Sequence, residues 1–216
     1  VDRLGAENSE GWVMDQRELK RLHPALRSRA IREALRRVRG DLRRLDWFDI
    51  NSIDALATGE AGEGCLDVPG ARVLRSMNWV RMEPAGQRQE PYDLELPVPG
   101  NVIAGPWRIE IGLGHGQGYT KDEVTPLAWC RIQPPLRLRT WQAGDRLQTE
   151  GMLREKKVKD LFIRARVPSW DRRLWPMITD SEGIVWMHRF GASARVTPPE
   201  PAASLVWVRC NRVFSK

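Results

Sequence analysis

Positively charged side chains recur between residues 136 and 165 of this 216-residue chain, where they alternate with apolar ones. The candidates for binding an anion in this segment are Arg139, Arg146, Lys156, Lys157, Lys159 and Arg164. Several cations that converge on one surface suit a sugar-phosphate backbone, which proteins recognise as charge and shape rather than as base sequence. The segment therefore predicts an interface for a nucleic acid.

Two predicted elements position these cations. The alternation over Leu136–Trp141 is typical of a strand, and Val158–Ala165 has the apolar spacing of a short helix. We expect Lys156, Lys157 and Arg164 on the solvent side of that helix, with Lys159 on its flank. Asp145 lies between a glycine and an arginine, so we expect it to fix a turn or orient a cation rather than to act as a base.

A second row of cations lies near the N-terminus. Pro24 and Gly40 mark the expected ends of a helix. Its polar side carries Arg29, Arg32, Arg36 and Arg39. Glu33 is placed to offset only Arg29 and Arg37, and a phosphate backbone would relieve the remaining repulsion. The alternative is a solvated face whose carboxylate partners come from elsewhere in the fold.

The overall charge supports an anionic partner. The net charge is +7, and residues 134–216 hold 16 Lys and Arg against 8 Asp and Glu. Such a local excess predicts nucleic acid first and a membrane surface second. No apolar run approaches the ~18 residues of a membrane-spanning helix, so we expect a cytoplasmic protein that does not enter a membrane. The three cysteines are far apart and predict neither disulfides nor a zinc site.

The residues contain no recognisable active site. The glycine-rich stretch Gly112–Gly118 lacks the Gly-Lys-Ser/Thr of a phosphate-binding loop, and the three histidines have no spacing typical of a metal site or a triad. We therefore predict no catalytic residue and no metal ligand in this chain.

The predicted fold class is α+β, in two modules. Residues 1–83 are expected to be mainly helical and to end in a small antiparallel element formed by Leu66–Val68, Arg72–Arg75 and Trp79–Met82. Residues 84–216 are expected to form a β-rich domain with short helices, after a linker at Ala85–Glu90. Its predicted strands are Tyr92–Leu96, Trp107–Ile111, Leu127–Ile132, Leu136–Trp141, Met177–Thr179, Ile184–Met187 and Leu205–Arg209, and its predicted helices are Val158–Ala165 and Trp170–Leu174.

Several motifs in the second module resemble, in order and spacing, the C-terminal domain of the bacterial tRNA(Ile)-lysidine synthetases. They are Leu136–Arg146, Gly151-Met152, Lys156–Phe162, Val167-Pro168 and Trp175–Trp186. A weaker resemblance links Leu22–Arg32 and Leu66–Met82 to the middle, substrate-binding domain of that family. The family's motif positions are occupied here by Arg139, Asp145, Arg146, Lys156, Lys157 and Lys159.

The resemblance implies a role in tRNA modification. The family uses ATP, with Mg²⁺, to activate the wobble cytidine of the isoleucine tRNA that has a CAU anticodon, and joins lysine to it. Its catalytic domain carries a Ser-Gly-Gly-x-Asp-Ser loop, which does not occur in this sequence. The resemblance therefore implies a chain that binds tRNA, with its last domain directed to the acceptor stem, but that holds no cofactor and is inactive alone.

Other functions stay open at this point. A free-standing RNA-binding protein with the same domain, a complete enzyme with an unrecognised active site, and a structural or oligomerisation module are the alternatives. A homodimer is also left open, because charge reasoning does not address the oligomeric state.

Overall fold

The computed structural model describes residues 5–8, 11–60, 62–86, 90–116, 118–120, 122–199 and 204–213. The chain divides into two compact units, one formed mainly by Val1–Arg88 and the other by Gln89–Val167 together with Asp171–Phe214. Part of the expected linker Ala85–Glu90 lies outside the described residues. Among the described helices, none has the length and apolar character needed to cross a membrane.

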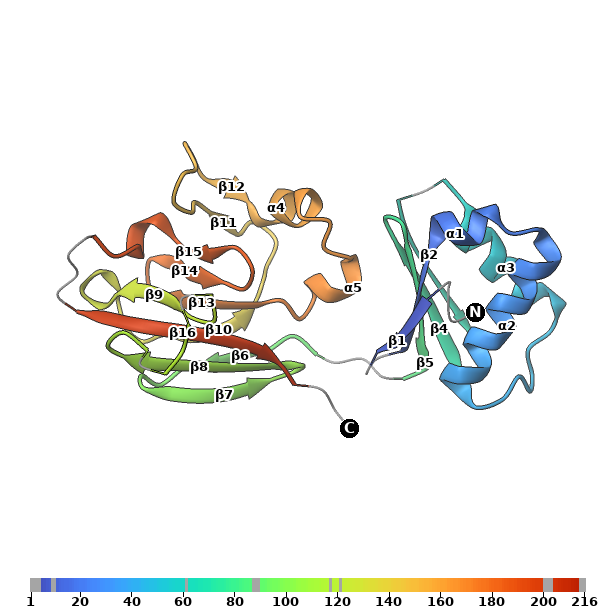
Figure 1. Cartoon of the computed structure of the whole chain (residues 1–216), viewed down its shortest axis with the longest axis horizontal. Helices are drawn as coiled ribbons and strands as arrows, with labels where there is room; N and C mark the ends of the chain where they lie inside the picture. The colour runs from blue at the N-terminus through green and yellow to red at the C-terminus, as the bar shows by residue number, and fades with distance from the viewer. Residues whose placement is uncertain are drawn as a thin grey trace. The chain divides into compact units, whose positions relative to one another are not determined.

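The first unit is an antiparallel sheet with helices on one face (Figure 1). Its helices are α1 (Gln16–Arg21), α2 (Pro24–Arg39) and α3 (Trp47–Thr58). Its five strands, in the order β1-β2-β5-β4-β3, are β1 (Gly5–Asn8), β2 (Gly11–Asp15), β3 (Glu63–Val68), β4 (Ala71–Ser76) and β5 (Trp79–Pro84). The three predicted strands are confirmed, and the predicted α+β class is confirmed. Strands β1 and β2 were not expected, so the sheet is larger than the sequence indicated.

Local chemistry fixes the ends of these helices. Asp15 caps α1 by accepting a hydrogen bond from the Arg17 amide. Pro24 occupies the first turn of α2, and the helix ends at Gly40, whose φ of 86° lies in the left-handed region. Asp46 opens α3 with a reciprocal capping box to Asp49. The apolar faces of the helices pack on β2, β4 and β5 around fully buried Met14, Leu19, Ile31, Leu35, Ile53, Val73, Val80 and Met82.

The second unit contains two larger sheets and a short hairpin (Figure 1). One sheet, in the order β7-β8-β16-β9, consists of β7 (Gly100–Ala104), β8 (Trp107–Leu113), β9 (Thr125–Ala128) and β16 (Leu205–Arg212). The other, in the order β15-β14-β13-β10-β6, consists of β6 (Asp93–Glu95), β10 (Arg137–Thr140), β13 (Pro176–Asp180), β14 (Gly183–Met187) and β15 (Gly191–Ala192). The remaining elements are the hairpin β11 (Arg146–Leu147) with β12 (Lys156–Lys157), α4 (Val158–Arg164), α5 (Ser169–Arg172) and two 3-10 turns at Trp129–Arg131 and Ala194–Val196.

The β13–β14 pair is buried on both faces. Ile178 and Val185 belong to one core, which is shared with β8 and β16, whereas Met177 and Met187 belong to another, which is shared with α4. Successive residues of a strand point to opposite faces, so one strand pair serves both cores. As Figure 1 shows, α4 and the β11–β12 hairpin lie on the side of this pair away from β7 and β8. The hairpin and α4 are therefore seated on a packed layer.

Most of the predicted elements of this unit are confirmed. Strands are observed at all seven predicted positions. In the segment predicted as Leu127–Ile132, the strand ends at Ala128 and a 3-10 turn follows. Strands β7, β11, β12 and β15 were not predicted. The two predicted helices correspond to α4 and α5.

Candidate nucleic-acid interface

The β11–β12 hairpin places two cations directly opposite each other. Its register places Arg146 opposite Lys157 and Leu147 opposite Lys156. The expectation that Lys156 and Lys157 lie in the helix is wrong, because their backbone pairs with β11 and α4 begins only at Val158. The amide of Val158 then donates to the Asp145 carbonyl over 2.9 Å, which joins the helix start to the turn before β11.

Helix α4 is anchored by one apolar side, as predicted. Val158, Leu161 and Phe162 are buried. The Phe162 ring meets three aromatic rings edge-on, at centroid distances of 5.6 Å for Trp141, 5.5 Å for Trp175 and 6.1 Å for Phe190. Such aromatic packing fixes the helix in both position and rotation. The polar side of α4, which carries Lys159, Asp160 and Arg164, is therefore held toward solvent.

Asp145 organises the turn that precedes β11. Its carboxylate accepts two hydrogen bonds of 2.8 Å from the guanidinium of Arg139 and one of 2.7 Å from the Gln142 amide. The Arg139 side chain is only 14% exposed, and its Nη1 also donates to the Thr140 carbonyl. The structure therefore corrects the placement of Arg139 among the surface cations: its donors are used internally, and it positions the turn.

The outer face of the hairpin carries two positive charges that are only weakly compensated. Arg146 and Lys157 are directly opposite and both exposed, and like charges so placed repel one another. Glu155 lies 3.3 Å from Arg146, but this ion pair is about half exposed on both sides and so contributes little. Lys159 is exposed on the adjacent first turn of α4.

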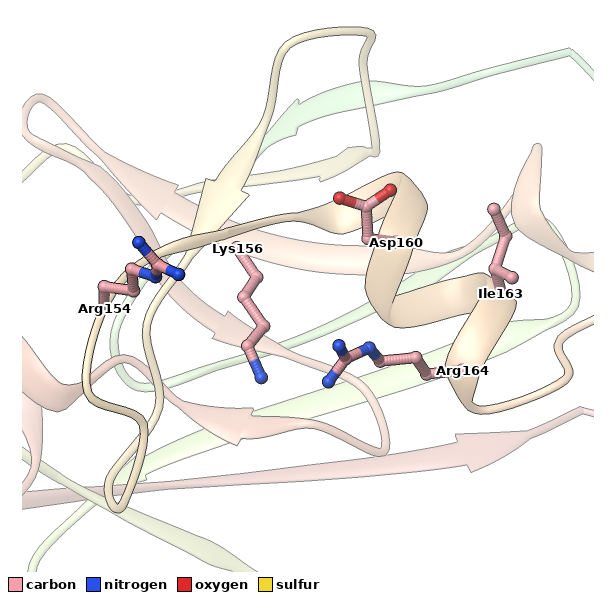
Figure 2. Close-up of a pocket in the computed structure, with 5 residues that line it drawn as sticks. All are labelled: Arg154, Lys156, Asp160, Ile163 and Arg164. Carbon is pink, nitrogen blue, oxygen red and sulfur yellow. The ribbon is translucent and has the colours of Figure 1, made fainter.

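Three cations gather around a pocket between the loop of this hairpin and α4. The pocket has a volume of about 390 Å³ and is lined by Arg154, Lys156, Asp160, Ile163 and Arg164. Figure 2 shows the charged ends of Lys156 and Arg164 pointing toward each other, with Arg154 reaching in from the loop and the Asp160 carboxylate turned away in this view. None of the three cations forms an ion pair within the described part of the chain, so the pocket is suited to an anion.

The sequence predicted two of the pocket's cations, Lys156 and Arg164, but missed the third. Arg154 lies in the loop between β11 and β12, where no periodic pattern marks the direction of a side chain. Ile163, which is 48% exposed at the rim, was also missed, because it follows the buried Phe162 in an otherwise apolar helix segment. The only signal for Arg154 in the sequence is its position two residues before Lys156.

The row of cations on α2 divides into exposed and engaged residues. Arg29 and Arg32 are exposed and form no ion pair among the described residues. Glu33 pairs with Arg36 over 2.9 Å and with Arg37 over 3.2 Å, so the expectation that it offsets Arg29 is wrong. Arg39 is 10% exposed and donates to the Arg43 carbonyl. Arg29 and Arg32 are thus the free cations of this helix, and Arg36 is partly neutralised.

Comparisons with known proteins match both units. A family model described as the TilS substrate C-terminal domain matches residues 136–207, and one described as the TilS substrate binding domain matches residues 15–81. A tRNA(Ile)-lysidine synthase of Solibacter usitatus is 36% identical over 210 residues, which are 90% of this chain and 47% of that protein. One of Geobacter sulfurreducens is 32% identical over 214 residues, which are 94% of this chain and 45% of that protein.

A solved structure supports the same comparison. The crystal structure of a TilS C-terminal domain is 27% identical and superimposes with a TM-score of 0.52, covering 58% of this chain and 100% of that one. The chain spans about half the length of the curated relatives that it matches.

Proposed function

This chain belongs to the TilS family of tRNA(Ile)-lysidine synthases, and on that premise we propose that its function is to bind tRNA. The observation that carries the proposal is the pocket formed by Arg154, Lys156 and Arg164, which lies within the part of the chain matched by the C-terminal family model. The three cations lack ion-pair partners among the described residues, and they project from the β11–β12 hairpin, its loop and α4. Such a site favours a phosphate backbone over a neutral ligand.

The exposed cations outside the pocket extend the same surface. Arg146 and Lys157 are exposed on the hairpin, and Lys159 is exposed on the first turn of α4. We assign phosphate contacts to these three residues as well. Arg29, Arg32 and, more weakly, Arg36 are proposed as a separate contact on the first unit. Arg139 and Asp145 are proposed as positioning residues, because their pair holds the turn from which Arg146 projects.

The activity of the whole protein is a further part of the proposal. We propose that it is a ligase that uses ATP and Mg²⁺ to join lysine to the wobble cytidine of the CAU-anticodon isoleucine tRNA, and that this chain alone is inactive. The described residues do not fit Mg²⁺, which takes an octahedral set of oxygen ligands, because the pocket offers one carboxylate, Asp160, among three cations. No group of three or more His, Cys, Asp and Glu suited to a metal lies within the described residues. The pocket therefore suits an anion rather than a metal ion.

A binding titration with pocket variants tests the proposal. Arg164→Ala and Lys156→Ala are expected to weaken binding of isoleucine tRNA by about 10- to 100-fold each, because a hydrogen bond to a charged group contributes ~1.5–3 kcal/mol. Each variant should also lower the slope of log affinity against log salt by about 1. Arg108→Ala, which removes an exposed arginine from β8 in another sheet, is the matched control and should change neither quantity. Pocket variants that bind like the wild type would exclude this pocket as the tRNA contact.

The oligomeric state and the cellular location remain predictions. A homodimer is tested by sedimentation of the purified chain with and without tRNA. The cytoplasmic location is tested by fractionation of cells that produce it.

A further inference from the structure

Two large aromatic side chains stand in solvent at the start of α3. Trp47 is 63% exposed and Phe48 is 71% exposed. Their rings meet at a centroid distance of 5.2 Å and an interplanar angle of 82°, so they support one another edge to face while their other surfaces stay open. Most aromatic residues of a globular domain are buried, and a contiguous exposed pair marks a surface that binds something.

The helix start holds this pair in place. The capping box between Asp46 and Asp49 fixes the backbone on either side of the two aromatic residues. Ile50 and Ile53 anchor the following turns in the core of the first unit. The exposed pair therefore lies on a fixed backbone that the core holds firmly.

Arginines precede the aromatic pair on the connection between α2 and α3. Arg43 and Arg44 are exposed, and neither forms an ion pair within the described residues. The connection is ordered: Arg39 donates to the Arg43 carbonyl over 2.8 Å, and Leu42 and Leu45 pack against the core. Two exposed arginines therefore precede the two open aromatic rings, with Leu45 and Asp46 between them.

We propose that Trp47 and Phe48 form a stacking platform for unpaired nucleobases, with Arg43 and Arg44 bound to the adjacent phosphates. Sites for single-stranded nucleic acid combine these two features, open aromatic rings and a cationic path along the backbone. The exposed arginines and the net charge of +7 favour an anionic partner, which RNA supplies and a second copy of this chain does not. This site goes beyond the proposed function: it lies on the first unit, away from the pocket residues in sequence, and it selects single-stranded RNA.

The test is a titration of the full chain with a fluorescent single-stranded RNA of about ten unstructured nucleotides, and with a blunt RNA duplex of the same length. Trp47→Ala is expected to weaken binding of the single strand by about 5- to 100-fold, because stacking contributes that much per base. Binding of the duplex should change by less than about twofold, since paired bases do not stack on the ring. Trp47→Phe should retain most of the single-strand affinity.

Leu26→Ala provides the matched control. Leu26 is a 50% exposed apolar residue on α2 of the same unit, and its loss should leave single-strand binding unchanged. Circular dichroism checks that each variant is folded. Unchanged single-strand binding by Trp47→Ala, or no binding by the wild type at low salt, overturns the proposal. It is also overturned if Trp47→Ala leaves RNA binding intact but abolishes self-association in sedimentation, which would assign the pair to a contact between copies.

The outcomes separate this site from the tRNA pocket. If Arg164→Ala weakens tRNA binding and Trp47→Ala leaves single-strand binding unchanged, the stacking platform fails while the proposed function stands. If Trp47→Ala weakens single-strand binding and Arg164→Ala leaves tRNA binding unchanged, the pocket fails while the platform stands.

Discussion

The pair of Asp145 and Arg139 links folding to the proposed binding surface at the level of single residues. Asp145 is 13% exposed and binds both the Arg139 guanidinium and the Gln142 amide. The turn that it closes leads directly into Arg146 and, through the hairpin, to Lys157. This largely buried carboxylate therefore fixes the turn from which the exposed Arg146 projects.

Replacing Asp145 is expected to lower stability more than replacing the exposed arginine next to it. Asp145→Ala leaves a largely buried guanidinium without its partner, at a cost of about 2–3 kcal/mol in the free energy of unfolding. Arg146→Ala removes a half-exposed ion pair and should cost less than about 1 kcal/mol, while it weakens tRNA binding. Urea denaturation of both variants measures the difference. Equal stability of the two variants would contradict the structural role given to Asp145.

His188 makes stability depend on pH. Burial, together with the nearby Arg189 and Arg212, lowers the pKa of His188 to about 4. Its ring packs against Trp107 and Trp175 at centroid distances of 4.6 Å and 5.2 Å. In the unfolded chain a histidine has a pKa of about 6.5. The stability that comes from keeping His188 neutral in the fold is therefore complete above pH 6.5 and is lost as the pH falls toward 4.

We therefore expect the free energy of unfolding to fall by about 2 kcal/mol more in the wild type than in His188→Gln when the pH is lowered from about 7 to about 4.5. This free-energy value allows for the partial solvent exposure of the His188 ring. Chemical denaturation at the two pH values measures this excess. Parallel losses in the two proteins would show that His188 is not the group responsible.

At the level of elements, the sequence predicted structure where local chemistry decides it. Pro24 and Gly40 delimit α2 as expected, and the alternating residues of β4 and β13 form strands. Lys156 and Lys157 were wrongly assigned to a helix, because residues with good helix propensity continue into α4 and nothing in their own spacing reveals the pairing with β11. Strands β1, β2 and β7 were missed, since their hydrogen bonds come from partners distant in sequence or from an unrecognised hairpin.

Gly40 gives a direct test of how α2 ends. An alanine there meets no neighbouring atom but must adopt a φ of 86°, so Gly40→Ala is expected to cost about 1 kcal/mol in the free energy of unfolding. Gly62→Ala is the matched control: its added Cβ also meets nothing, and its φ is outside the left-handed range. Thermal or urea denaturation should show a loss for Gly40→Ala only. A neutral Gly40→Ala would mean that the end of α2 adjusts without cost.

At the scale of the whole chain, the sequence predicted the segment that lines the pocket but not the arrangement within it. Charge counting and motif order pointed to residues 136–165, which supply the pocket of Arg154, Lys156 and Arg164. They did not distinguish Arg139, whose charge is used inside the fold, from the exposed cations, because a one-dimensional pattern does not reveal which carboxylate folds back on which arginine. The exposed Trp47 was missed for a related reason: tryptophan is usually buried, and only the packed structure reveals the exception.

The most direct test of the central claim is a titration of the whole chain with isoleucine tRNA bearing the CAU anticodon, at two salt concentrations, beside elongator methionine tRNA and an RNA hairpin. The account predicts tRNA binding at low salt that weakens steeply as salt rises, because the contacts displace counterions from phosphates. Tighter binding of the isoleucine tRNA than of the other two would add that this chain itself discriminates. Absence of tRNA binding at low salt would contradict the claim that these cations bind tRNA.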